Sequence, residues 1–318
     1  MSDIKLERNG QPTPFAKHGK LHVTGTKLLN EKNEICQLRG ISTHNLSLYP
    51  EYINEKAFTQ FVDEMGITIV RLAMYSAEAD DVLGYADGSD AHKKELEELV
   101  LKGVKIASDL GIYVMIDWHI LLDPDPNTHK DMAIRFFKNL CPKLKEYDNV
   151  IYEICNEPNK ETTWEDIKRY ANEVIPVIRE LDAEKVIIVG TPVWSQDVDI
   201  AAKSPLPYPN LMYTLHFYAD THKDSLRNKL DAALADGLPV FVTEFGICDA
   251  SGNGPINDEE TNIWIEKLNN NDISYIIWNL SCKDETSAIL APGCSKCCDF
   301  LPTDYSPCGQ RVPGYMKA

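Results

Sequence analysis

The sequence predicts an α/β fold of one specific kind, a closed (β/α)8 TIM barrel, and three observations lead to it. Apolar β-type runs recur eight times along the 318 residues, helical patterns lie between them, and polar or aromatic residues stand where the runs end. Strands that alternate with helices indicate right-handed crossovers and a parallel sheet. Eight such strands favour a closed barrel over an open doubly wound sheet. No glycine-rich phosphate loop follows the first run, which argues against a dinucleotide-binding fold.

The chain can be divided into expected elements in order. Residues 1–18 form an expected arm, and Lys20 to Leu29, with a turn at Gly25, predicts a short hairpin. The predicted strands are 36–42, 68–74, 113–118, 150–155, 185–190, 211–217, 239–245 and 273–280. The predicted helices are 55–65, 92–110, 132–147, 164–181, 224–235 and 259–269, with a short additional one at 196–203. Residues 291–318 are rich in Cys, Pro and Gly and predict an atypical C-terminal segment without a full eighth helix.

Composition limits the classes of partner. The chain is 43% hydrophobic and contains no Ser/Gly/Pro-rich linker, so we expect residues 1–318 to form a single domain with its core at about 20–290. The formal charge of -17 argues against binding to nucleic acid or to an anionic membrane surface. No apolar run is long enough to span a membrane, and Met1 to Ile4 lacks the pattern of a secretory signal.

The nine cysteines are unevenly distributed. Five are scattered through the body of the chain and are expected to act as small buried hydrophobes: Cys36, Cys141, Cys155, Cys248 and Cys282. The other four cluster near the end: Cys294, Cys297, Cys298 and Cys308. The spacing of Cys294 and Cys297 fits a zinc knuckle, but no second spaced pair follows. Free thiols, a disulfide and a metal site therefore all stay open for this cluster.

Two glutamates end two of the predicted strands. Glu157 closes the apolar run that begins at Ile151, and Glu244 closes the run that begins at Val240. Side chains at the carboxyl ends of barrel strands converge on one mouth, so we expect the two carboxyls to meet. Other polar and aromatic residues stand at equivalent strand ends: His44, Arg71, Tyr75, His119, Asn156, Trp194, His216, Tyr218 and Trp278. Glu153 lies about 13 Å deeper on its strand, and we expect it to be a buried structural partner of Arg39 outside the site.

Two facing carboxyls suit one reaction in particular. They cannot both ionise easily, so one keeps a proton while the other stays charged, which is the division that glycoside hydrolysis needs. Taken singly, each of these residues has a structural explanation: a strand-end Glu can be a helix cap, Arg71 an ion pair, a His a satisfied polar residue and a Trp part of the core. Such explanations would have to hold at eight strand ends at once, and the joint pattern therefore favours a catalytic site.

The neighbours of each carboxyl predict its role. Arg71 and Tyr218 would keep Glu244 ionised as a nucleophile, and Glu157, near His216, would serve as acid and base. Asn156 could donate to a sugar 2-hydroxyl. The remaining expected substrate contacts are the hydroxyl-binding His44 and His119 and the ring-stacking Trp278 and Trp194. The mechanism requires neither a metal nor an organic cofactor.

The same residues resemble a known family. The motifs that carry the resemblance are Arg39 to His44, Arg71 to Tyr75, Asp117 to His119, Glu153 to Asn159, His216 to Tyr218, Thr243 to Gly246 and Trp278 to Leu280. Together they resemble glycoside hydrolase family 5, whose retaining (β/α)8 enzymes carry an acid/base and a nucleophile glutamate on strands four and seven. The segments 189–198 and 283–288 are most similar to those of the bacterial endo-β-1,4-glucanases, or cellulases, of that family.

The resemblance implies a function and further site residues. Glu157 would be the proton donor and Glu244 the nucleophile, with Arg71, His119, Asn156, His216 and Tyr218 in support. Substrate-binding residues would be His44, Tyr49, Tyr75, Trp194, Trp278, Lys283 and Glu285, where Lys283 and Glu285 contact distal glucose units. Relatives often carry a stacking Trp where this chain has Leu48, which leaves Tyr49 as the substitute.

We therefore expect a monomeric, endo-acting, retaining β-1,4-glucanase that acts on cellulose or soluble β-glucans. The alternatives are the same chemistry on mannan, xyloglucan or mixed-linkage glucan, and a carbohydrate-binding barrel without catalysis. A thiol or zinc interaction module at the clustered cysteines is a further alternative. No carbohydrate-binding module is apparent in the sequence, which favours soluble or amorphous glucan as substrate. We expect a secreted protein whose signal peptide is absent from this chain, with a cytoplasmic location as the alternative.

Overall fold

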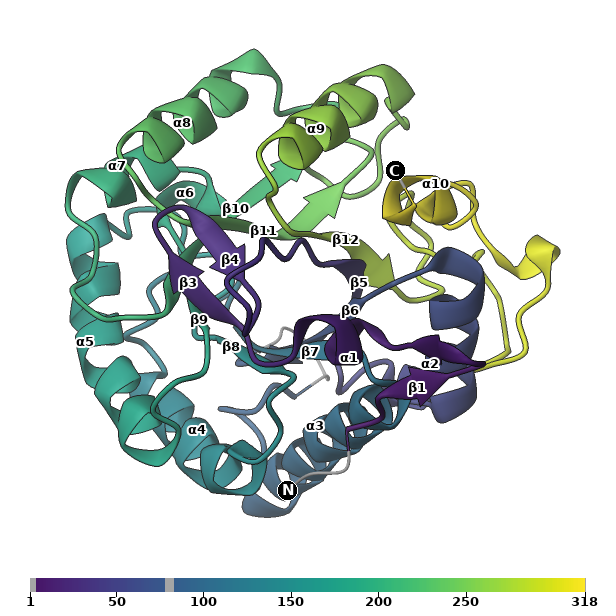
Figure 1. Ribbon diagram of the computed structural model, residues 1–318, viewed down its shortest axis with the longest axis horizontal. Coiled ribbons are helices and arrows are strands. Elements are labelled where there is room, and N and C mark those ends of the chain that lie inside the picture. The colour runs from purple at the N-terminus through teal and green to yellow at the C-terminus, as the bar shows by residue number, and fades with distance from the viewer. Residues whose placement is uncertain (1–3, 78–82, 318) are drawn as a thin grey trace.

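The computed structural model describes residues 4–77 and 83–317, and a closed barrel of eight parallel strands forms its centre (Figure 1). The strands are β5 (Arg39–Thr43), β6 (Ile69–Tyr75), β7 (Tyr113–His119), β8 (Val150–Glu153), β9 (Ile187–Val189), β10 (Leu211–Tyr218), β11 (Val240–Gly246) and β12 (Tyr275–Leu280). Consecutive strands are neighbours, and β12 pairs in parallel with β5 to close the ring. The predicted barrel and its eight strands are confirmed.

Helices surround the barrel (Figure 1). They are α2 (Glu55–Gln60), α3 (Asp90–Leu110), α4 (Lys130–Leu144), α5 (Trp164–Leu181), α6 (Pro192–Ser195), α7 (Val198–Lys203), α8 (Asp224–Ala235) and α9 (Asp258–Asn270). Local sequence explains several boundaries: Thr163 and Asp166 form a capping box at the start of α5, and Gly111 ends α3 in the left-handed conformation. The predicted helix 55–65 is α2 followed by a π-helical turn, η2 (Phe61–Met65).

The N-terminal segment covers one end of the barrel. The predicted hairpin is present as β3 (His22–Thr24) and β4 (Lys27–Leu29). The expected arm also contains regular structure: β1 (Glu7–Arg8), β2 (Gln11–Pro12) and α1 (Pro14–His18). Leu21 and Leu28 belong to a cluster of buried side chains with Ile69 and Phe241, which come from barrel strands. This packing closes the end of the barrel at which the strands begin.

The C-terminal segment replaces a full eighth helix. After β12 the described part of the chain forms a short 3₁₀ helix, η3 (Pro302–Asp304), and then the five-residue helix α10 (Val312–Met316). Phe300 stacks on Phe61 with ring centroids 5.6 Å apart, and the Tyr275 hydroxyl donates to the Tyr315 carbonyl at 2.8 Å. The segment thus packs between the last strand and the first outer helix: α10 contacts η2, and Figure 1 shows the C-terminal segment beside α2.

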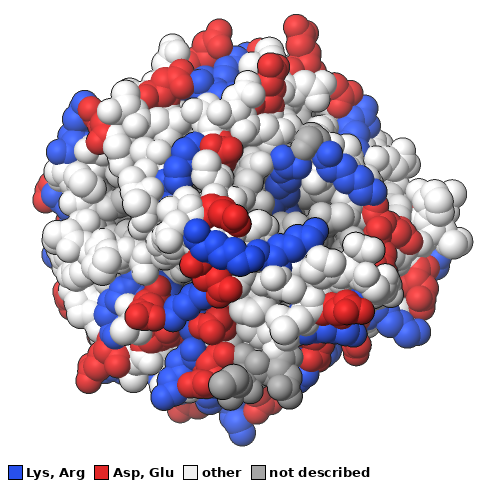
Figure 2. All heavy atoms as spheres, viewed as in Figure 1, with Lys and Arg blue, Asp and Glu red and all other residues white. Residues whose placement is uncertain are grey.

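All nine cysteines lie in the described part of the chain, and all nine are free thiols there. Cys36, Cys141, Cys155 and Cys248 are buried, as predicted, whereas Cys282 is half-buried. In the same described ranges, no helix has the length and apolarity needed to cross a membrane. Figure 2 shows the hairpin side of the molecule, where Lys and Arg side chains are interspersed with Asp and Glu.

Candidate active site

The opposite end of the barrel holds a cavity of about 590 Å³. Eleven of the predicted site residues line it: His44, Tyr75, His119, Glu157, Trp194, His216, Tyr218, Glu244, Trp278, Lys283 and Glu285. Arg71 and Asn156 are fully buried beside it and reach its lining residues through hydrogen bonds. Tyr49 is not among the residues that line the cavity; its ring packs edge-on against His44, at 5.3 Å between centroids.

The two carboxyls of Glu157 and Glu244 face each other across this cavity. A carboxylate oxygen of each lies within 4.8 Å of the other, and His216 lies within the same distance of both. Retaining glycosidases hold their carboxyls about 5–5.5 Å apart, whereas inverting enzymes leave about 6.5–9.5 Å for a water molecule. The spacing therefore fits direct attack by one carboxylate.

Two donors stabilise the charged form of Glu244. Arg71 Nη1 donates to its Oε2 at 3.2 Å, and the Tyr218 hydroxyl donates to its Oε1 at 2.9 Å. Burial raises the pKa of Glu244 to about 7, while His216, Arg71 and the Tyr218 hydrogen bond act in the opposite direction. With a cation and a phenol in contact, Glu244 is the carboxyl of the pair that gives up its proton first.

Glu157 lies in a different environment. Its Oε1 is 2.8 Å from His216 Nδ1, and no Lys or Arg in the described ranges contacts its carboxyl group. Burial raises the pKa of Glu157 to about 8, with Arg71 opposing the rise and Asp117 adding to it. Because the two glutamates interact, they titrate as a pair, and the first proton to bind resides on Glu157.

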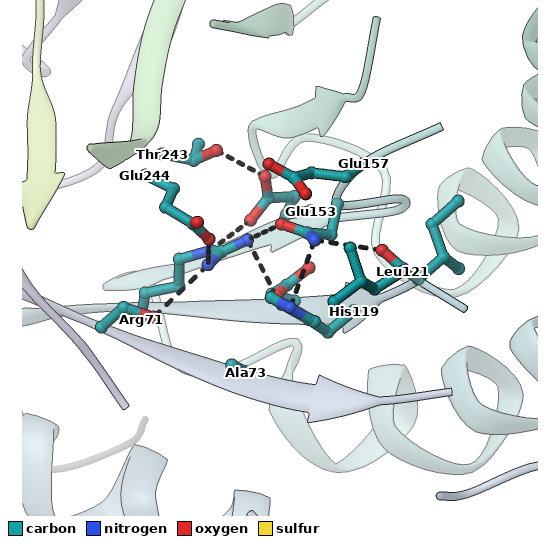
Figure 3. A network of polar contacts seen from close by, with 12 residues as sticks. Arg71, Ala73, His119, Leu121, Glu153, Glu157, Thr243 and Glu244 are labelled. Atoms are coloured by element: carbon teal, nitrogen blue, oxygen red, sulfur yellow. Dashed lines mark hydrogen bonds and ion pairs between the residues drawn. The ribbon is translucent and has the colours of Figure 1, made fainter. Parts of the chain in front are cut away.

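Arg71 holds a buried polar network together (Figure 3). Its Nε donates to Glu153 Oε2 at 2.7 Å, and its Nη2 donates to Asn156 Oδ1 at 2.6 Å and forms an ion pair with Asp117 at 2.9 Å. The prediction that Glu153 pairs with Arg39 is wrong, because the cation that contacts Glu153 is Arg71. Glu153 is completely buried, as expected, but it belongs to the network that carries Glu244.

The side-chain amide of Asn156 is already bonded. Its Nδ2 donates to the Ile120 carbonyl at 3.0 Å and to His119 Nε2 at 3.2 Å. His119 Nδ1 in turn lies 2.6 Å from Asp117 Oδ2. A sugar 2-hydroxyl could therefore accept from Asn156 only in exchange for one of these two contacts, of which the one with His119 is the longer.

An aromatic wall stands beside the two carboxyls. Tyr75 stacks on His119 with ring centroids 4.1 Å apart, and Trp278 stacks on the same histidine at 5.3 Å. His44 packs against Tyr75 at 5.8 Å and Trp278 at 5.1 Å. These rings offer flat apolar surface of the kind that the C–H face of a sugar requires.

Trp194 lies in α6 (Pro192–Ser195), which is a left-handed turn and not an ordinary α-helix. Val193, Trp194 and Ser195 have φ values of 57°, 55° and 56°, a left-handed conformation that is costly for residues with a Cβ. Contacts hold the turn in place: Trp194 N donates to the Pro158 carbonyl at 2.9 Å, and Ser195 Oγ donates to the Asn156 carbonyl at 2.6 Å. As a result, the indole of Trp194 remains 41% exposed at the mouth.

Lys283 and Glu285 form an ion pair at 2.7 Å on the rim. Glu285 also accepts from Asn279 Nδ2 and from Ser287 Oγ, each at 2.9 Å. The carboxylate of Glu285 is thereby fixed, and Lys283, which is about half-exposed, can turn its ammonium group to a ligand.

Comparisons with known proteins agree with this geometry. The model of the cellulase family, glycosyl hydrolase family 5, matches residues 29–284. The chain belongs to glycosyl hydrolase family 5. Endoglucanase A of Butyrivibrio fibrisolvens is 45% identical over 290 residues, which are 91% of this chain and 66% of that protein. An endoglucanase of Clostridium saccharobutylicum is 43% identical over 295 residues, 92% of this chain and 64% of that protein. The chain spans about two thirds of the length of these relatives.

Solved structures of family 5 enzymes are similar to this chain over nearly its whole length. The cellulase Cel5C_n is 42% identical with a TM-score of 0.90, and the match covers 96% of this chain and 94% of that one. The catalytic domain of the Thermobifida fusca endoglucanase Cel5A, solved in complex with cellotetraose, is 33% identical with a TM-score of 0.89, and the match covers 96% of this chain and all of that one.

In this family 5 chain, Glu157, His216 and Glu244 are spaced as metal ligands would be. Each of the three side chains is already hydrogen-bonded to another protein group. Arg71 supplies positive charge to Glu244, and His216 is bonded to Glu157 on one side and to Thr243 on the other. We interpret the cluster as a proton-sharing group.

Sequence reasoning missed several residues of the site. Asp117, Glu153 and Thr243 take part in the buried network, and Gln196 and His222 line the cavity. The period of two along a strand gives a signal for Asp117, because it shares a face of β7 with His119. Glu153 is the last residue of β8, and Glu157 lies four residues beyond it. The two cavity residues come from loops, for which the sequence has no equivalent signal.

Proposed function

We propose that this family 5 chain is an endo-acting, retaining β-1,4-glucanase that cleaves cellulose or related soluble β-glucans by double displacement. One observation carries the proposal: the carboxyl oxygens of Glu157 and Glu244 lie within 4.8 Å of each other in one cavity. Their partners differ in the way that the two roles require, with donors on Glu244 and a histidine on Glu157. The endoglucanase names of the most similar relatives support the choice of substrate.

In the first step, Glu244 attacks the anomeric carbon of the sugar. Glu157 gives its proton to the glycosidic oxygen, the bond between that oxygen and the anomeric carbon breaks, and an ester links the sugar to Glu244. Arg71 and Tyr218 keep Glu244 ionised until it attacks. As the new bond takes up the negative charge of Glu244, Arg71 remains balanced by Asp117 and Glu153.

In the second step, Glu157 acts as a base. It removes a proton from a water molecule, which attacks the anomeric carbon from the side that the leaving group has vacated and releases Glu244. Two inversions at the same carbon retain the β configuration. Water needs no separate binding space between the carboxyls, which agrees with their short separation.

The remaining cavity residues would bind the polymer. We assign the wall of Tyr75, His119 and Trp278 to the sugar at the reacting centre, and Trp194 to the leaving-group side. Lys283 and Glu285 would contact more distant glucose units at the rim. Tyr49 would act indirectly, because it supports His44 from behind.

Replacement of each carboxyl tests the proposal. Glu157→Ala and Glu244→Ala should each abolish the release of reducing sugar from carboxymethylcellulose, with the unfolding temperature close to that of the wild type. Glu95→Ala, which removes an exposed carboxyl on α3, is the matched control and should keep full activity. NMR of the first product from cello-oligosaccharides should show the β anomer. An α anomer would contradict the double displacement.

The substrate range needs its own measurement. We propose β-1,4-glucan as the preferred polymer, and rates on mannan, xyloglucan and mixed-linkage glucan would reveal a different preference. A barrel without catalysis would bind cello-oligosaccharides and release no product. We also propose that the protein is secreted, because a glucan polymer is digested outside the cell, and fractionation of the native host tests this point. We further propose that it is monomeric, which size-exclusion chromatography tests.

A further inference from the structure

A continuous chain of hydrogen bonds links the two carboxyls through the interior of the barrel. From Glu157 Oε1 it passes to His216 Nδ1 at 2.8 Å, and from His216 Nε2 to Thr243 Oγ1 at 2.8 Å. Thr243 Oγ1 donates to Glu153 Oε1 at 2.6 Å, and Glu153 Oε2 accepts from Arg71 Nε at 2.7 Å. Figure 3 shows Thr243 and Glu153 in contact between the two catalytic carboxyls.

Thr243 determines the direction of these bonds. Its hydroxyl has one proton to give and faces three polar atoms: Glu153 Oε1, His216 Nε2 and Thr214 Oγ1. An ionised Glu153 can only accept, so it takes that proton. His216 must then carry its own proton on Nε2 and donate it to Thr243. A neutral imidazole with a proton on Nε2 has an unprotonated Nδ1, and that nitrogen faces Glu157.

We propose that Thr243 and Glu153 are positioning residues that fix His216 in its Nε2–H tautomer, so that the bare Nδ1 keeps a proton on Glu157. The inference rests on the proposed role of Glu157 as acid and base. It assigns a task to two residues that do not line the cavity. They act on the reaction only through the imidazole of His216.

The reverse arrangement would place a proton on Glu153 and leave Glu157 ionised, with His216 Nδ1 donating to it. Arg71 argues against that arrangement, because its guanidinium contacts Glu153 directly, whereas no cation of the described chain contacts Glu157. Burial raises the pKa of Glu157 to about 8, whereas the charge of Arg71 and its hydrogen bond oppose the rise that burial causes in the pKa of Glu153. Burial also lowers the pKa of His216 to about 4, so the ring is neutral.

Other charged or titratable groups surround Glu157 and His216, and all of them stay in place in the tests below: Arg71 on β6, Asp117 and His119 on β7, Tyr218 on β10, His222 after β10 and Glu244 on β11. Their combined field acts on both tautomers. Among the described residues, Thr243 is the hydrogen-bond partner of Nε2, so the loss of its hydroxyl changes the balance between the two tautomers.

The tautomer has a consequence for each step. Before the first step it keeps Glu157 protonated at neutral pH, as an acid must be. After that step Glu157 is a carboxylate that faces a nitrogen lone pair, which is an unfavourable contact. The contact is relieved when Glu157 takes a proton from the attacking water, so the same tautomer favours the base role.

Replacement of Thr243 tests the inference through the pH profile. In Thr243→Val the partner of Nε2 is lost, so His216 can move its proton to Nδ1 and donate to an ionised Glu157. The alkaline limb of kcat/KM on cellotetraose should then move to lower pH by about one unit, the effect of one hydrogen bond of ordinary strength. Thr243→Ser keeps the hydroxyl and should restore the limb. An unmoved limb in Thr243→Val would overturn the proposal.

A second substrate separates positioning from general damage. The 2,4-dinitrophenolate group leaves without a proton, so kcat/KM on 2,4-dinitrophenyl β-cellobioside should be nearly the same in wild type and Thr243→Val. An equal loss on both substrates would indicate a merely structural role and would reject the proposal. If the wild type hydrolyses neither substrate, the proposed function itself has failed.

The tautomer can also be observed directly in the wild type, without any variant that must fold. In protein labelled with ¹⁵N-histidine, the Nε2 of His216 should show the chemical shift of a protonated nitrogen and the Nδ1 that of an unprotonated one. His216→Gln identifies the signal. A protonated Nδ1 at neutral pH would overturn the inference independently of catalysis.

Discussion

Removal of the Tyr218 hydroxyl should shift the acid limb of the pH profile upward. In Tyr218→Phe the ring stays in the cavity wall, and the structure loses one hydrogen bond, the 2.9 Å contact with Glu244 Oε1. That bond favours the ionised form of Glu244, so its loss raises the pKa of this carboxyl. Hydrogen bonds to charged groups contribute about 1.5–3 kcal/mol, which corresponds to about 1–2 pKa units.

The kinetic effect follows from the need for an ionised nucleophile. At pH values below the acid limb, kcat/KM should fall about 10- to 100-fold, one factor of ten for each unit of pKa. At pH values above the limb the loss should be much smaller, because Arg71 still contacts Glu244 at 3.2 Å. The assay is the pH dependence of kcat/KM on a soluble cello-oligosaccharide.

Tyr208→Phe is the matched control, because its hydroxyl contacts Asn172 on the outside of the barrel, at 3.0 Å. Its pH profile should coincide with that of the wild type. If Tyr218→Phe lowers the rate equally at all pH values, the hydroxyl acts in substrate binding or in the transition state, and the assignment of Tyr218 to the charge of Glu244 is wrong.

Three further predictions concern stability and substrate length. Arg71→Met should lower the free energy of unfolding at pH 7 by about 3–5 kcal/mol, because it leaves buried carboxylates without their cation. Burial raises the pKa of these carboxyls in the folded protein, so they take up protons as the pH falls toward 5, and the loss of stability should become smaller. Urea unfolding at both pH values would measure this difference. Gly40→Ala should lower the unfolding temperature sharply, since its Cβ would lie 1.9 Å from the Ile69 carbonyl oxygen, whereas Gly314→Ala meets no atom within 4 Å and should not. Trp194→Ala should reduce kcat/KM on long oligosaccharides up to about tenfold while the unfolding temperature stays unchanged, and Ile200→Ala, another exposed apolar residue, should have no kinetic effect.

Much of the fold was predictable because parallel barrel strands are buried on both faces. Their sequences are continuous apolar runs, such as Ile187–Val189, and the polar residues at their ends mark the mouth. Glu157 and Glu244 were found in this way, and the structure brings them together. The partner of Glu153 was not found, because position along the strand decided it: Arg39 begins β5, whereas Arg71 lies in the middle of β6, level with Ser42.

The turn at Trp194 could not be predicted from local sequence. A left-handed conformation is usually marked by Gly or Asn, but here it is adopted by Val193, Trp194 and Ser195. The bonds that hold it come from the Asn156 and Pro158 carbonyls, in another part of the chain. Only the assembled barrel supplies these contacts, so the local sequence carries no signal for the turn.

The way in which the C-terminal segment joins the first outer helix also bears on how the molecule folds. The side-chain amide of Gln60 donates to the Phe300 carbonyl at 2.7 Å and accepts from the Phe300 N–H at 2.8 Å, although the two residues are 240 positions apart in the sequence. Contacts between such distant residues form slowly, because a long loop must close before they can stabilise the folded chain. The seam between β12 and β5 should therefore be the last part of the cylinder to assemble, and protease protection should reach Phe300 later than the interior strands.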